Sequence, residues 1–390
     1  MHTARLLCAL TLIWPGLALP NPYVPKNDAV VLERLPNRLN DSAASELRRL
    51  RVAASPRDPA ASAALARRYF DLAMADGDPR YIGYAEAALR PWRDASDAPP
   101  EQFLLRGMLR QYRHDFAGGL ADFERALERD PANAEVRSWR AAIFMVKADY
   151  ASARGECGAL VRVASELVAA GCRAYVDATT GDAAGAYRRL RDALERRAEV
   201  PAGLRIWTLT RLAEFADRIG DTQAAERHFR AALKAGLDDN YLLAAYADFL
   251  LEQNRPREVL GLLAGRERSD TLLLRLALAA RELGTREAPA LAAMLEERFA
   301  ASAQRGERLH LAEEARFLLV LKGDAKDALA AAEENWQSQR EPRDAAILIE
   351  SALAANDPGA AAPALRWLRE SRYEAVALRE MARRLEANRR

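Results

Sequence analysis

Few side chains in this chain have the types and the spacing that catalysis needs. Its histidines are scattered over the sequence, at His2, His114, His228 and His310. The run His310-Leu-Ala-Glu313-Glu314 lacks the second histidine of a metalloprotease helix, so we interpret it as surface charge. No G-x-S-x-G, phosphate-loop or dinucleotide fingerprint is present. The sequence therefore predicts a protein that is not an enzyme and needs no cofactor. An active site assembled from scattered acids such as Glu313 and Glu314 is the alternative.

The cysteines allow a disulfide but do not favour a metal site. Cys8 falls in the first twenty residues, and Cys157 and Cys172 remain. If the chain turns near Ser165, these two lie opposite one another across an antiparallel helix pair. In an oxidising compartment they would then form a disulfide; otherwise they are two small core residues. Two thiols without a nearby histidine are a poor metal site, and the acidic loop at 238–240 has too few oxygen ligands for calcium.

The overall charge argues against a nucleic-acid partner. Lysine and arginine number 58 against 56 acids, which gives a net charge of +2. Arginines alternate with acids along the chain and do not gather in basic stripes. Alanine, leucine, arginine and glutamate dominate, while runs of Val, Ile and Thr are scarce, so the composition predicts an almost entirely helical protein.

The elements that must position any site are helix hairpins. The stretch from Pro100 to Pro131 reads as an amphipathic helix with Gly107, a break at His114-Asp115, and a second helix with Gly119 and Phe123 that Pro131 ends. Glycine tolerates the left-handed end of a helix, and aspartate caps the helix that follows. Equivalent turns recur every 30 to 39 residues, at Gly77-Asp78, His114-Asp115, Ala148-Asp149, Gly181-Asp182, Gly220-Asp221, Asn254-Arg255, Gly284-Thr285, Gly323-Asp324 and Asn356-Asp357.

This pattern resembles the tetratricopeptide repeat, a helix-turn-helix unit of about 34 residues with glycine, alanine, aromatic and proline landmarks in this order. The resemblance implies an all-α solenoid of stacked antiparallel helix hairpins, with about nine pairs over residues 60–370. Residues 371–390 would form a capping helix over the last exposed core face. The resemblance also implies the work of such repeats, which is to hold other macromolecules.

The expected contact surface is the concave groove lined by the first helix of each pair. Residues one turn apart on those helices give the predicted partner-binding residues: Leu104, Met108, Tyr112, Ala142, Met145, Tyr175, Glu214, Asp248, Leu278, Arg281 and Phe317. An apolar N-terminal half and a partly acidic centre would suit an extended peptide or a partner helix. Alternatively, the spacer, a terminal segment or a neighbouring helix covers these apolar residues.

The N-terminus predicts export. Residues 1–20 have a charge at Arg5, an apolar run from Leu6 to Leu19 and small residues at Gly16-Leu17-Ala18, as in a signal peptide. The run is shorter than the roughly 20 residues of a membrane-spanning helix, so an uncleaved anchor is the alternative and the mature chain should have no integral span. Residues 21–59 then form a linker with an N-terminal arm and helix.

These features predict a non-catalytic interaction scaffold in the periplasm of a bacterium, whose arginine-rich composition fits a GC-rich genome. Secretion or peripheral attachment to the envelope is the alternative address. The alternative role is an accessory subunit of outer-membrane, secretion or exopolysaccharide machinery that binds a protein or a glycan.

Overall fold

A computed structural model describes residues 41–53 and 58–387. The predicted signal peptide and the proline-rich spacer after it lie outside the described residues. The described residues fall into two units with the boundary between Glu46 and Leu47, within helix α1 (Asp41–Ala53). The second unit holds all the repeats and is described here by itself.

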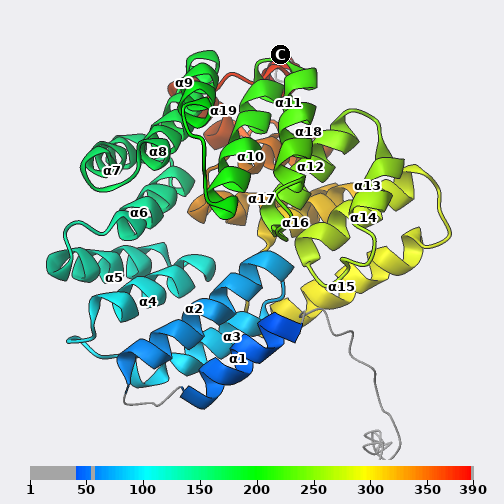
Figure 1. The fold of residues 1–390 in the computed structure, drawn as a ribbon. Helices are drawn as coiled ribbons and strands as arrows, with labels where there is room; N and C mark the ends of the chain where they lie inside the picture. Colours follow the sequence, from blue (N-terminus) through cyan, green and yellow to red (C-terminus); the bar gives the residue numbers. More distant parts are fainter. Residues whose placement is uncertain (1–40, 54–57, 388–390) are drawn as a thin grey trace, which may run out of the picture. The chain divides into compact units, whose positions relative to one another are not determined.

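Helices make up the second unit, and its described residues contain no strand (Figure 1). After α1 the elements are α2 (Pro59–Asp76), α3 (Arg80–Ala88), η1 (Arg90–Trp92), α4 (Pro100–Tyr112), α5 (Phe116–Arg129), α6 (Ala134–Val146), α7 (Tyr150–Val163), α8 (Glu166–Thr179), α9 (Ala183–Glu195), α10 (Ala202–Arg218), α11 (Thr222–Leu233), α12 (Asn240–Glu252), α13 (Pro256–Leu262), α14 (Asp270–Glu282), α15 (Ala288–Gln304), α16 (Leu311–Arg316), η2 (Phe317–Lys322), α17 (Ala325–Ser338), α18 (Pro342–Ala354), α19 (Ala362–Ser371) and α20 (Val376–Ala387).

Sequence neighbours among these helices pack as antiparallel hairpins. The pairs run from α2 with α3 to α18 with α19, and within the described residues they number nine. In the eighth pair the first helix continues from α16 into the π-helical η2. The structure therefore confirms the predicted fold class, an all-α stack of helix hairpins.

The turns inside the hairpins have the predicted geometry. The first turn residue has a positive φ in all nine pairs: Gly77, His114, Ala148, Gly181, Gly220, Asn254, Gly284, Gly323 and Asn356. The aspartate that follows caps the second helix in several pairs. Asp115, for example, accepts a hydrogen bond from Gly118 N at 3.0 Å, and Asp221 accepts one from Ala224 N at 2.9 Å. Local backbone chemistry thus sets the hairpin spacing.

Close helix contacts occur where the sequence has small residues. A Cβ added at Gly107 of α4 would lie 2.4 Å from the Phe123 ring of α5, and Phe123 is fully buried. Gly171 of α8 meets the Trp207 ring of α10 in the same way. The second contact joins one hairpin to the next, and a continuous apolar core runs through the middle repeats from α8 to α14.

The last repeats have an apolar core of their own. Leu311, Trp336, Leu348 and Trp367 belong to it, and α20 closes it with Leu378 and Leu385. Val376, the first residue of this helix, is exposed. No helix in the described part of the chain is both long and apolar enough to span a membrane.

Candidate functional site

The apolar residues of the predicted groove are buried. Leu104, Met108, Met145, Leu278 and Phe317 are each between 1 and 7% exposed. Helix α2 packs beside α4, and its Arg67 reaches Met108 Sδ at 3.7 Å. Leu278 and Phe317 share a cluster formed by α14, α15 and η2. Side chains buried in this way do not reach a partner in this conformation, because a neighbouring helix covers them.

The other predicted groove residues are more accessible. Arg281 is exposed, while Ala142 and Tyr112 are half-buried. Burial raises the pKa of Tyr112 to about 12, so its hydroxyl stays protonated at neutral pH. The partner-binding role of these residues remains a prediction.

Tyr175 and Glu214 belong to a charged and aromatic group that we call the inner polar cluster: Tyr175, Arg211, Glu214, Tyr241 and Glu341. The Arg211 guanidinium lies 4.5 Å from the centroid of the Tyr175 ring and 4.7 Å from that of Tyr241. Glu214 accepts from Arg211 at 2.9 Å and from the Tyr241 hydroxyl at 2.6 Å. Burial raises the pKa of Tyr175 well above its usual value, which keeps its hydroxyl a donor.

Asp248 joins three helices through two arginines. It contacts Arg275 of α14 at 2.5 Å and Arg316 of α16 at 2.7 Å. Burial alone would raise the pKa of Asp248, but the two guanidinium groups outweigh it and lower the pKa to about 2. Sequence reasoning placed Asp248 in the groove, whereas the structure pairs it with the chain's own C-terminal repeats.

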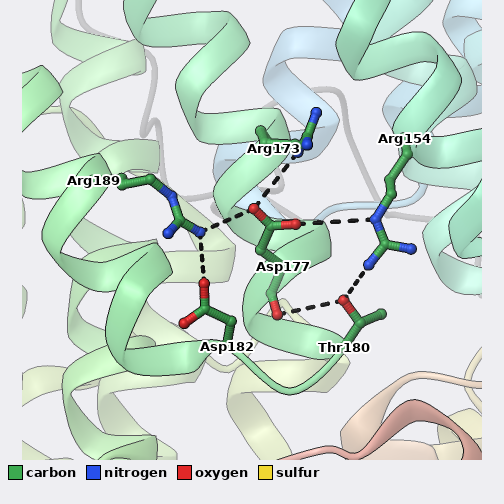
Figure 2. A pocket seen from close by; sticks show the side chains of 6 residues that line it. All are labelled: Arg154, Arg173, Asp177, Thr180, Asp182 and Arg189. Carbon is green, nitrogen blue, oxygen red and sulfur yellow. Dashed lines mark hydrogen bonds and ion pairs between the residues drawn. The ribbon is translucent and has the colours of Figure 1, made fainter.

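A second group of charges, which we call the arginine pocket, lines an open depression of about 460 Å³ (Figure 2). Its residues come from three successive helices and their turns: Arg154, Arg173, Asp177, Thr180, Asp182 and Arg189. All three arginines approach Asp177, with Arg189 at 2.9 Å, Arg173 at 3.6 Å and Arg154 at 4.0 Å. Arg189 also pairs with Asp182 at 3.0 Å.

The arginine pocket keeps an excess of positive charge. Three guanidinium groups face two carboxylates, and the arginine side chains remain between 42 and 58% exposed. Sequence reasoning missed the arginine pocket. Spacing predicts that Arg173 and Asp177 meet one helical turn apart, but no local pattern brings Arg154 and Arg189 to the same point.

The hairpins on either side of the arginine pocket are joined covalently. Cys157 of α7 and Cys172 of α8 form a disulfide, and the turn between them places Ser165 as the cap of α8. Of the two alternatives for these cysteines, the structure contains the bridge. The bridge holds α7 and α8, which carry Arg154 and Arg173, in a fixed relation.

Glu313 and Glu314, the acids that the sequence offered for an alternative active site, have different charged neighbours. Glu314 lies 3.8 Å from Arg308, and burial raises its pKa. Burial alone would raise the pKa of Glu313, but the charges of His310, Arg343 and Arg275 lower it. Among the residues that the structure describes, no group of three or more His, Cys, Asp or Glu side chains is arranged to hold a metal ion.

The hairpin stack, its left-handed turns and its close helix contacts define a tetratricopeptide-like helical-repeat fold. No model of a known family and no curated protein matches the sequence. Among solved structures, the fold resembles the Cut9-Hcn1 hetero-tetramer of the APC/C, with a TM-score of 0.51 and 13% identity over 83% of this chain. The alignment spans 62% of that chain. The TPR domain of P58(IPK) aligns at 14% identity over 83% of this chain and 98% of its own, with a TM-score of 0.23. At these identities the likeness concerns the fold alone.

Proposed function

We propose that this chain is a non-catalytic scaffold that holds a protein partner in the bacterial periplasm. Solenoids of helix hairpins generally act by presenting an extended surface to other macromolecules. The signal-peptide pattern and the disulfide between Cys157 and Cys172 support an oxidising, exported location. The identity of the partner would show whether the chain serves outer-membrane, secretion or exopolysaccharide machinery.

The observation that carries this proposal is the arginine pocket. Arginine presents a planar fork of donors that matches a carboxylate in two-point contact. Because Arg173 and Arg189 are more than half exposed, carboxylates on a partner can compete for their unused donors without unfolding the chain. The partner therefore carries Asp or Glu side chains at its contact point. Such contact weakens as salt rises.

The test is partner capture from envelope extracts with the mature chain and two matched variants. Arg173→Gln/Arg189→Gln removes two positive charges from the arginine pocket. Arg188→Gln/Arg227→Gln removes two charges at exposed positions outside it. We expect the pocket variant to lose at least tenfold in partner affinity and the control variant to bind as the wild type does.

Circular dichroism reports whether each variant keeps its helix content, so a loss of binding caused by unfolding is told apart from a loss caused by the missing charges. A stoichiometric partner that the pocket variant binds as well as the wild type contradicts docking at the arginine pocket. Absence of any stoichiometric partner, together with turnover of an envelope substrate, contradicts the scaffold itself.

A further inference from the structure

The segment that connects α17 to α18 lies against three successive first helices. Gln339 has φ −122° and ψ 131°, and Glu341 has φ −85° and ψ 166°, so the backbone of this segment is extended. We call residues Gln339, Arg340 and Glu341 the inner strap. In sequence the inner strap is more than 160 residues from the helices that it contacts.

Each residue of the inner strap meets a different hairpin. Gln339 Nε2 lies 3.4 Å from Nδ1 of His114, in the turn after α4. Arg340 donates its backbone N–H to the carbonyl of Val146, the last residue of α6, at 2.7 Å. Glu341 accepts from the Tyr175 hydroxyl of α8 at 2.9 Å. The inner strap is thus an extended segment that contacts successive helices through one backbone hydrogen bond and the side chains on either side of it. A peptide bound in a groove has the same geometry.

Polar contacts hold the repeats that carry the inner strap against the middle repeats. Besides Arg316 with Asp248, Trp367 donates to the Tyr150 hydroxyl at 2.7 Å, and the Arg218 guanidinium lies 4.3 Å from the Tyr373 ring. In Figure 1 these orange and red helices lie against the green middle repeats. Among the described residues, the apolar core of residues 311–385 takes in one residue from elsewhere, Ala148. Leu318 of η2 also packs against the cluster of α14 and α15, so apolar contacts join the last repeats to those helices, whereas the contacts of the inner strap with the ends of α4, α6 and α8 are polar. A polar interface within a chain opens more readily than an apolar one.

We infer that the inner strap is a built-in competitor for a peptide-binding surface formed by the ends of α4, α6 and α8. Its partner is an extended peptide that carries a carboxylate where Glu341 accepts from Tyr175. This inference rests on the proposed function, since it assumes that the chain holds protein partners. It adds that the ends of α4, α6 and α8 are closed to a partner until the inner strap leaves, because two extended segments cannot occupy the same space and the Tyr175 hydroxyl has only one proton to donate.

The experiment uses the full mature chain and a fluorescent synthetic peptide with the sequence of residues 337–344, QSQREPRD. In the wild type the tethered inner strap competes at an effective concentration in the millimolar range. The variant Gln339→Ala/Glu341→Ala removes the side-chain contacts of the inner strap with His114 and Tyr175, together with the cap that the Glu341 side chain gives α18 and the bond from Gln339 to Asn335. We expect this variant to bind the peptide at least tenfold more tightly than the wild type.

Two further variants make the result specific. Glu333→Ala/Gln337→Ala changes exposed residues of α17 and should bind the peptide as weakly as the wild type. We call Gln339→Ala/Glu341→Ala the released variant. Adding Tyr175→Phe to it deletes the hydroxyl that would donate to the peptide, and should abolish most of the gain in peptide affinity. A released variant that keeps its helix content but gains no affinity overturns the inference.

A second measurement covers the case in which the released variant fails to fold. In the otherwise wild-type chain, Tyr175→Phe should raise hydrogen exchange of peptides covering 338–345 severalfold and leave α19 unchanged. Unchanged exchange at 338–345 would also overturn the inference. Neither measurement needs a natural partner, so failure of the arginine-pocket test leaves this result interpretable, and the reverse holds.

Discussion

Single charged side chains set how the last repeats sit on the middle ones. Glu252 of α12 stands near Asp217 of α10, Asp248 of its own helix and Glu350 of α18, with Arg316 of α16 as the opposing charge. Burial, followed by these carboxylates, raises the pKa of Glu252 to about 7. Neutral Glu252 therefore suits the packed arrangement, while its ionised form adds a further negative charge to the group.

Replacing Glu252 by Gln should change how stability depends on pH. The folded pKa is raised from 4.5 to about 7, so the stabilising effect of the protonated form is complete below pH 4.5 and is lost as pH rises through 7. Because water still reaches this side chain, we expect a difference of about 1 kcal/mol or less between the two pH limits.

Urea unfolding of wild type and Glu252→Gln at pH 5 and pH 8 measures this effect. At pH 8 the free energy of unfolding of Glu252→Gln should exceed that of the wild type, and at pH 5 the two should be equal. Glu258→Gln is a suitable control, because Arg255 lowers the pKa of Glu258 and no gain at pH 8 follows. Parallel behaviour of Glu252→Gln and the control would exclude the assigned role of Glu252.

At the scale of the helices, glycines have two distinct roles. Gly107 leaves room for the buried Phe123 ring, whereas a Cβ at Gly155 of α7 would meet no described atom within 4 Å apart from its chain neighbours and the backbone of its own helix. The first glycine is a packing requirement, and the second costs helix propensity with no contact inside the chain to explain it.

Alanine at these two positions should therefore act in opposite directions. Gly107→Ala is expected to destabilise the chain by about 1 to 3 kcal/mol through overpacking. Gly155→Ala is expected to stabilise it by about 0.5 to 1 kcal/mol, since it removes the glycine penalty in mid-helix. The urea midpoints measure both effects, and a shift of the same sign in both variants would contradict the account of interlocked α4 and α5.

At the scale of the whole molecule, the signal-peptide pattern of residues 1–20 predicts an exported chain. Fractionation with N-terminal sequencing should recover a periplasmic protein that begins near Leu19 to Asn21. Unfolded, unreduced protein should show no free thiol, because Cys8 would leave with the predicted signal peptide and Cys157 is bridged to Cys172. Full-length cytosolic protein with three reactive cysteines would refute export and the oxidised state together.

The sequence by itself determined the hairpins. Left-handed helix ends and aspartate caps depend on one or two adjacent residues, so Gly77-Asp78, Gly220-Asp221 and their equivalents were readable directly. For Cys157 and Cys172 the same local reasoning left two alternatives, a bridge across a turn near Ser165 or two small core residues, and the structure contains the bridge. It also identified Leu104 and Met108 as one apolar face of a first helix.

Only the tertiary structure decided what those faces contact. Small rotations between successive hairpins accumulate along a solenoid, and no local pattern fixes their sum. The accumulated rotation places Gln339 beside His114, although the two are 225 residues apart in sequence. It also places Arg154, Arg173 and Arg189 around Asp177. Apolar side chains that spacing assigns to an open groove, such as Leu104, Met108 and Phe317, are therefore covered by the chain's own helices. Contacts of this kind depend on the accumulated path of the stack.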